Sequence, residues 1–100
     1  MSDQQPKAAL SDCRSRIDVV DRRIVALLNE RTRIVEEIGN IKRKMQMPIY
    51  EPRREDEVFA NATASNAGPL SGDAVKRIFE RIVDEMRVVQ KTRMEKESQC

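Results

Sequence analysis

The sequence predicts an all-helical fold with three helices, one long, one short and one of medium length. Apolar residues recur at helical spacing through most of the 100 residues, and no stretch shows the two-residue alternation of a strand. Pro48 and the Gly68-Pro69 pair divide this pattern into three parts. Helices joined by short loops are typical of a bundle.

The first helix is predicted to begin between Pro6 and Ser11 and to end near Gln46. Its apolar residues form two rows at heptad spacing. One row contains Leu10, Ile17, Ile24, Arg31, Ile38 and Met45, and the other contains Cys13, Val20, Leu27, Ile34 and Ile41. At about 1.5 Å per residue the helix would be roughly 50 Å long, more than the width of a compact domain of this size. We therefore expect a second chain to cover it.

The second helix is predicted to be short. Pro48 stops the first helix, and Pro52 suits the first turn of a new one. The apolar face of this helix carries Val58, Phe59 and Ala62. We expect it to end around Asn66-Ala67-Gly68, where the residues favour a turn.

The third helix is predicted from about Asp73 to Glu95, with Ser71 as a candidate cap. Its apolar stripe consists of Val75, Ile78, Phe79, Ile82, Val83, Met86 and Val89. Gln90 continues this stripe at helical spacing, so we expect its amide to face inward.

One domain is expected, spanning residues 10–95 between flexible ends at residues 1–9 and 96–100. The chain has 19 Lys and Arg against 17 Asp and Glu, a net charge of +2 that is too balanced for a nucleic-acid-binding surface. Aromatic residues, at 3%, are too few for a base-stacking platform.

No run approaches a membrane span, so the cytoplasm is the expected location. Cys13 and Cys100 are interpreted as reduced thiols.

The chain contains no histidine, which removes the usual general base and the commonest metal ligand. We expect neither a metal nor a cofactor. Any catalysis would then depend on fixed charges and hydrogen bonds.

Arg31 occupies an apolar row, where a charge is costly unless an anion satisfies it. It could bind a ligand, pair with a glutamate of a neighbouring helix, or set the register of a dimer. Lys42 lies on the same helix face, about 20° away in rotation and about 16 Å further along the axis. Arg14 lies about 25 Å from Arg31 in the other direction, so only the Arg14 of an antiparallel partner helix could join the same site.

Each of these residues also has an ordinary structural interpretation. Arg14 and Lys42 could be solvated charges at the edge of the helix, and Gln90 could be a structural amide. The cluster from Glu51 to Glu55 could be a solvated helix terminus.

Together, however, these residues resemble the all-helical class of chorismate mutases, which are small intertwined dimers. The resemblance covers about Leu10 to Gln90. It is carried by Arg14, Leu28-Asn29-Glu30-Arg31, Ile38-Gly39-Asn40-Ile41-Lys42, Pro48-Ile49-Tyr50-Glu51-Pro52-Arg53-Arg54-Glu55 and Gln90.

The resemblance implies that the dianion chorismate rearranges to prephenate in an intramolecular Claisen reaction without proton transfer. Such a site must hold the substrate in a reactive geometry and stabilise charge on its ether oxygen. By the resemblance, Arg31 of one chain and Arg14 of the other bind the two carboxylates. Lys42 and Gln90 hydrogen-bond the ether oxygen.

In the same family pattern, Glu55 accepts a hydrogen bond from the substrate hydroxyl, Glu51 assists nearby, and Arg54 supports the site. The chain departs from the pattern at two positions. Glu51 stands where the best-known member of the family has an aspartate. Met86 stands where a serine often helps to hold a substrate carboxylate, so we expect weaker substrate binding. Because Gln90 can donate without being protonated, activity is expected to persist through neutral pH.

Two other functions compete with the mutase. Isochorismate-pyruvate lyases share the helical dimer and the cationic pocket, although the pair Arg54 and Glu55 favours the mutase. A non-catalytic dimerisation or regulatory module is the second alternative, but such a module would gain stability by replacing Arg31 with an apolar residue. A larger pathway enzyme is a further candidate partner.

Overall fold

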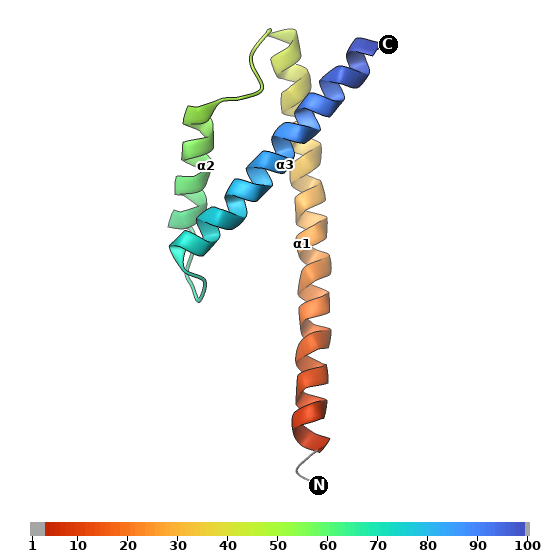
Figure 1. Ribbon diagram of the computed structural model, residues 1–100, viewed down its shortest axis with the longest axis vertical. Coiled ribbons are helices and arrows are strands. Elements are labelled where there is room, and N and C mark those ends of the chain that lie inside the picture. The colour runs from red at the N-terminus through yellow and green to blue at the C-terminus, as the bar shows by residue number, and fades with distance from the viewer. Residues whose placement is uncertain (1–3, 100) are drawn as a thin grey trace. The chain divides into compact units, whose positions relative to one another are not determined.

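The structure, a computed structural model, describes residues 4–99 of the chain and the side chains of residues 5–93. Three helices follow one another, α1 (Gln4–Lys44), α2 (Pro52–Ala64) and α3 (Gly72–Gln99), as Figure 1 shows. Residues 4–99 contain no strand, so the all-helical prediction is confirmed. None of the described helices is long and apolar enough to cross a membrane.

The helix boundaries differ from the predicted ones by a few residues. The helix α1 already includes residues 4–9, which were expected to be flexible, whereas residues 1–3 and 100 lie outside the described residues. At its other end α1 stops at Lys44, two residues before the predicted Gln46. The reason is a Schellman turn in which Gln46 has a φ of 57° and Met47 N–H donates to the carbonyl of Lys42 at 2.8 Å.

The helix α2 ends at Ala64, earlier than predicted, because local hydrogen bonds close its last turn. The Ser65 hydroxyl donates to the carbonyl of Ala62 at 3.0 Å, and Asn66 N–H donates to the carbonyl of Thr63 at 3.2 Å. The predicted cap of α3 is confirmed, since Ser71 Oγ accepts a hydrogen bond from Ala74 N–H at 3.1 Å.

The chain divides into two compact units, Met1–Arg33 and Ile34–Cys100. The described part of the first unit is a single stretch of α1, and none of the side chains of residues 5–33 is buried. Its large apolar residues, each about half exposed or more, are Leu10, Ile17, Val19, Val20, Ile24, Val25 and Leu27. A lone helix cannot bury such residues, because it has nothing to pack them against.

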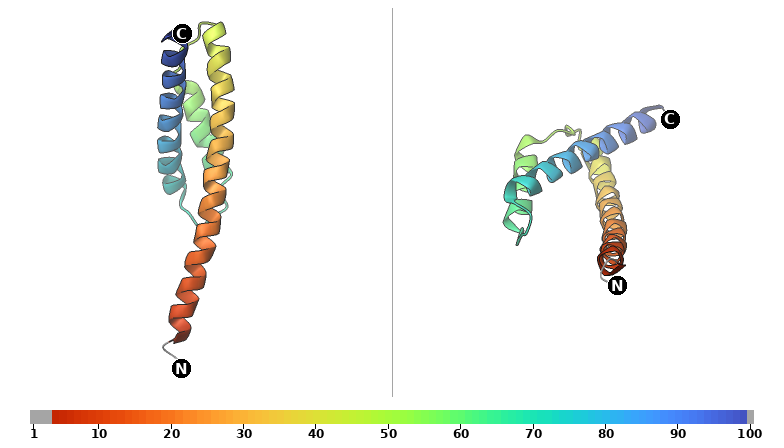
Figure 2. Two further views of the ribbon diagram at one scale, coloured as in Figure 1. Left: turned by 90° about the vertical axis from the view of Figure 1, so that its right-hand side faces the viewer. Right: turned by 60° about the horizontal axis from the view of Figure 1, so that its bottom comes forward.

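The second unit contains the last turns of α1, the connecting loops, α2 and α3. The helices α2 and α3 pack against each other, and both views of Figure 2 show them side by side. The small apolar core consists of Val35, Val75, Val83 and Met86. An ion pair of 2.6 Å between Arg93 Nη1 and Glu36 Oε2 joins α3 to the end of α1.

The buried face at the end of α1 is not the face of the apolar rows. Val35, Gly39 and Lys42 are buried, at the spacing of one helix face. In contrast, the row residues Ile34, Ile38, Ile41 and Met45 remain 40–65% exposed. This part of α1 therefore has one face covered by its own chain and a second apolar face that is not.

Candidate active site

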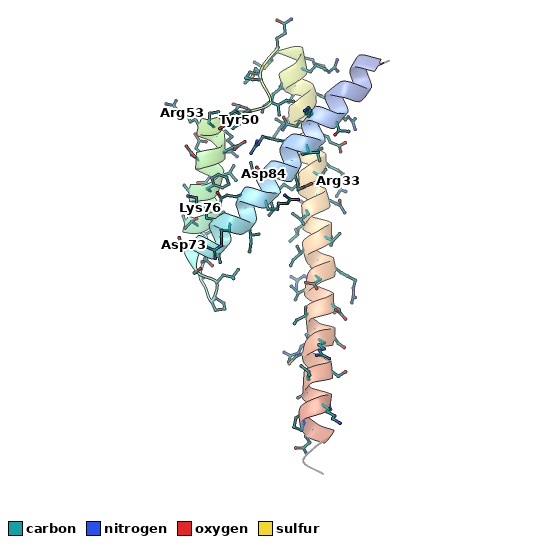
Figure 3. The ribbon with its side chains drawn as sticks, viewed as in Figure 1. Arg33, Tyr50, Arg53, Asp73, Lys76 and Asp84 are labelled. Atoms are coloured by element: carbon teal, nitrogen blue, oxygen red, sulfur yellow. The ribbon has the colours of Figure 1, made fainter. Side chains whose placement is uncertain are left out.

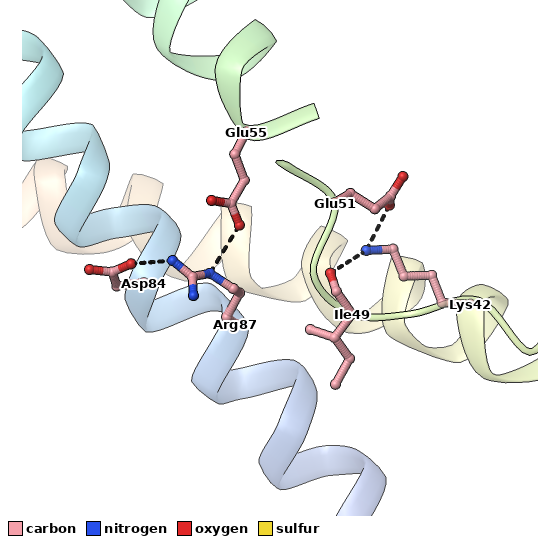
Figure 4. Close-up of polar contacts among 6 residues, drawn as sticks. All are labelled: Lys42, Ile49, Glu51, Glu55, Asp84 and Arg87. Atoms are coloured by element: carbon pink, nitrogen blue, oxygen red, sulfur yellow. Dashed lines mark hydrogen bonds and ion pairs between the residues drawn. The ribbon is translucent and has the colours of Figure 1, made fainter. Parts of the chain in front are cut away.

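Lys42 is a buried cation near the end of α1, where only 7% of the residue is exposed. Its ammonium Nζ donates to the carbonyl of Ile49 at 2.9 Å and forms an ion pair with Glu51 Oε1 at 2.8 Å (Figure 4). These contacts compensate for the loss of water around the charge. They use two of the three N–H donors of an ammonium, so the third can be offered to another acceptor.

Glu51 occupies the N-cap position of α2, yet its side chain makes no capping hydrogen bond. Its carboxylate instead lies against Lys42, with 36% of the side chain exposed. Together with the bond from Lys42 to the Ile49 carbonyl, this ion pair fixes the loop between α1 and α2. The loop in turn holds the lysine head group in place.

Gln90 is a buried amide on α3, with 9% of the residue exposed. A Cβ atom built on Gly39 would lie 3.6 Å from Gln90 Cγ, so the side chain packs against Gly39. Gly39 precedes Lys42 by three residues, so both lie on the same buried face of α1. Among the described residues, Gln90 Oε1 is buried and has no hydrogen-bond partner.

The unpaired oxygen of Gln90 points to a role in binding. An unsatisfied buried polar atom costs about 1–3 kcal/mol, so a side chain with a purely structural role is normally paired. The two ends of the amide are similar in shape, and a half-turn of the group would present its N–H₂ at the same place. The Gln90 amide can therefore offer either an acceptor or a donor to a ligand.

Glu55 lies in the first turn of α2, and 17% of its side chain is exposed. Its Oε2 atom forms an ion pair with Arg87 Nε of α3 at 2.9 Å (Figure 4). The guanidinium of Arg87 also pairs with Asp84, and its central carbon lies 5.4 Å from the centre of the Tyr50 ring. Figure 3 shows Tyr50 beside the start of α2 and Asp84 on α3.

Six of the eight predicted site residues thus lie in the Ile34–Cys100 unit, and four of these six are the polar side chains described above. They are Lys42, Glu51, Glu55 and Gln90. Arg54 belongs to the same unit, but its side chain is 61% exposed and pairs with Glu57 of the same helix at 3.2 Å. Met86 is a buried core residue, with 8% exposed.

The two remaining predicted residues, Arg14 and Arg31, belong to the Met1–Arg33 unit. Arg14 is exposed and Arg31 is half-buried. Sequence reasoning did not identify Arg87 or the contact of its guanidinium with Tyr50. The available signal was the spacing of Arg87, three residues before Gln90 on the same helix.

The site combines a buried ammonium, a buried amide and two carboxylates. Such groups can bind an anion, stabilise negative charge on an oxygen and accept a hydrogen bond from a hydroxyl. The described residues contain no group of three or more metal-ligating side chains.

Comparisons with known proteins match the chain to one family. The model of the family described as chorismate mutase type II matches residues 13–91. The bifunctional chorismate mutase/prephenate dehydratase of Aquifex aeolicus is 36% identical over 78 residues, which are 74% of this chain and 22% of that protein. A chorismate mutase of Methanocaldococcus jannaschii is 32% identical over 50 residues, half of each chain.

A solved structure is similar over most of its length. The chorismate mutase of Thermus thermophilus, in its form II, superposes with a TM-score of 0.80 and 34% identity, over 82% of this chain and 93% of that chain. By contrast, the chain spans about a fifth of the length of the bifunctional relatives that it matches.

Proposed function

The chain belongs to the chorismate mutase type II family, and we propose that it catalyses the rearrangement of chorismate to prephenate. Two observations carry the proposal, the buried ammonium of Lys42 and the buried amide of Gln90, whose oxygen has no hydrogen-bond partner among the described residues. A Claisen rearrangement needs no general base. It needs an enclosed site that restrains the substrate and stabilises charge as it develops on the ether oxygen.

In this proposal Lys42 and Gln90 act on the ether oxygen. Lys42 Nζ donates its third N–H, and the Gln90 amide, with its oxygen and nitrogen assigned the other way round, also donates from its N–H₂. Donors held in place before the reaction lower the barrier because they need not reorganise when charge appears. Neither group has to change its protonation state, so the rate should vary little between pH 5 and 7.5.

Glu55 is proposed to accept a hydrogen bond from the substrate hydroxyl, and Glu51 assists at the same end of the site. The contact of Glu51 with Lys42 Nζ adds a second role, since it orients the ammonium. Arg54 and Met86 are proposed to contribute less. Arg54 lies on the exposed side of α2, and the thioether of Met86 cannot bind a carboxylate.

We further propose that two copies of the chain form an intertwined homodimer. The support comes from the apolar rows, in which nine large apolar side chains are each at least 40% exposed, namely Leu10, Ile17, Val20, Ile24, Leu27, Ile34, Ile38, Ile41 and Met45. An exposed stripe of this length is typical of an interface. In the dimer, Arg31 of one chain and Arg14 of the other bind the substrate carboxylates.

The experiment that tests the proposal is incubation of the purified protein with chorismate and, separately, with isochorismate. Proton NMR would identify the products. We expect prephenate from chorismate and much slower conversion of isochorismate. Rapid release of pyruvate from isochorismate would make the protein a lyase instead, and no product from either would favour a non-catalytic helical module. A cytoplasmic location and a complex with a larger pathway enzyme stay predictions of the sequence.

A further inference from the structure

The guanidinium of Arg87 connects three segments of the Ile34–Cys100 unit. It lies 5.4 Å from the centre of the Tyr50 ring in the loop before α2, and its Nε is 2.9 Å from Glu55 Oε2 in the first turn of α2. Within α3 it pairs with Asp84, one turn earlier (Figure 4). Arg87 therefore links α3 both to that loop and to α2.

The three contacts differ in what they do. The pair with Asp84 lies within one helix, and Asp84 is 54% exposed, so this pair mainly limits the rotation of the arginine. The Tyr50 ring restrains the guanidinium from the loop side. The Glu55 side chain is the most enclosed of the three partners of Arg87, with 17% exposed against 54% for Asp84 and 55% for Tyr50. An enclosed carboxylate depends strongly on its cation.

The ion pair also affects which oxygen of Glu55 can accept a hydrogen bond from a ligand. Arg87 Nε approaches Oε2 without the alignment of a hydrogen bond, so the contact acts through charge and proximity. A carboxylate has two oxygens. With Oε2 next to the guanidinium, Oε1 is the atom that can accept a hydrogen bond from a substrate hydroxyl.

We propose that Arg87 is a positioning residue for the reaction, because it holds Glu55 with Oε1 free to bind the substrate hydroxyl. The inference rests on the proposed function. Arg87 itself touches no reacting atom in this scheme and acts through Glu55. A purely structural role for Arg87, joining α2 to α3, is the alternative that an experiment has to exclude.

The experiment is a double-mutant cycle with Arg87→Met and Glu55→Gln, in which kcat and KM for chorismate are measured for each variant. Alone, Arg87→Met should lower kcat/KM by about tenfold, mainly through KM, which is the size expected for losing the hydrogen bond from the substrate hydroxyl to the Glu55 carboxylate. In the Glu55→Gln background the same change should alter kcat/KM by less than about twofold, because the carboxylate to be positioned is absent. A structural role that does not act through Glu55 would instead give equal losses in both backgrounds. A purely structural role of the Arg87–Glu55 ion pair would lower the thermal unfolding temperature and leave kcat/KM of the folded variant unchanged.

Arg81→Met is the matched control. Arg81 lies on the same helix and pairs with Glu85 at 2.9 Å, but its side chain is 78% exposed. Its replacement should leave kcat/KM unchanged. Arg87→Gln, which also removes the charge, replaces Arg87→Met in the same cycle if Arg87→Met does not fold, as judged by thermal unfolding.

The possible failures can be told apart. If the unmodified protein forms no prephenate, the proposed function and the inference both fall. If it forms prephenate but the losses from Arg87 and Glu55 multiply, or if Arg87→Met costs nothing, only the inference is overturned.

Discussion

The Met1–Arg33 and Ile34–Cys100 units share one helix but differ in what covers it. In the first unit none of the side chains of residues 5–33 is buried, although the apolar rows run along it. In the second unit the buried face of α1 is formed by Val35, Gly39 and Lys42, and α3 packs against it. A heptad pattern therefore indicates that a helix will be covered, but not whether its own chain or another chain covers it.

The comparison also separates two kinds of cation. Lys42 has its partners within its own chain, at Glu51 and at the Ile49 carbonyl. Arg14 is exposed on the uncovered stretch of α1. The contacts of Lys42 can thus be tested within one chain, whereas the proposed role of Arg14 requires the proposed dimer.

The largest effect is expected from Lys42→Met, which removes the buried cation of the Ile34–Cys100 unit. The rate of prephenate formation should fall by about 100- to 1,000-fold, as when one preorganised donor to a developing charge is lost. Thermal unfolding should change little, because the Glu51 carboxylate left behind is 36% exposed and can be hydrated. A loss of less than tenfold would mean that Lys42 does not donate to the ether oxygen of the substrate.

The second largest effect is expected from the two arginines of the Met1–Arg33 unit. Arg14→Ala and Arg31→Ala should each lower activity strongly when present in both chains of a dimer. Mixing and refolding the two variants together should restore part of the activity, because one of the two sites in a heterodimer has both arginines intact. Activity would be followed by loss of chorismate absorbance. No recovery in a sample with demonstrated heterodimers would contradict a shared site.

The smallest effect is expected from one matched pair of valines. Val83 is 7% exposed in the core of the second unit, and Val20 is 47% exposed in an apolar row. Val83→Ala should lower the free energy of unfolding by about 1–2 kcal/mol. Val20→Ala should instead weaken dimerisation, which analytical ultracentrifugation over a range of concentrations would detect. An unchanged dimer would mean that the second copy does not cover this row.

Much of the secondary structure could be predicted from the sequence. The positions of Pro48, Pro52 and Ser71 mark helix ends that the structure confirms to within a few residues. The error at Gln46 has a local cause, since a glutamine in a left-handed conformation carries no sequence signal like that of glycine. The inward position of Gln90 also followed from helical spacing alone.

The site was only partly predictable. Lys42 was first identified by its position on the helix face of Arg31, whereas Glu51 and Glu55 were selected by resemblance, and none of their partners was foreseen. Glu51 was expected near the substrate hydroxyl, and in the structure its carboxylate lies against Lys42. Arg87 was not identified from the sequence, because its partner Glu55 lies 32 residues earlier in the chain.

The sequence by itself therefore determined the three helices, most of their ends and the identity of the polar residues on apolar faces. These features depend on neighbours within a turn or two of helix, where spacing and local hydrogen bonds decide. Only the tertiary structure decided that Val35, Gly39 and Lys42 form the buried line of α1, and that Arg87 faces Glu55 and Tyr50. Those pairings join residues of different helices, and their geometry arises when the helices pack.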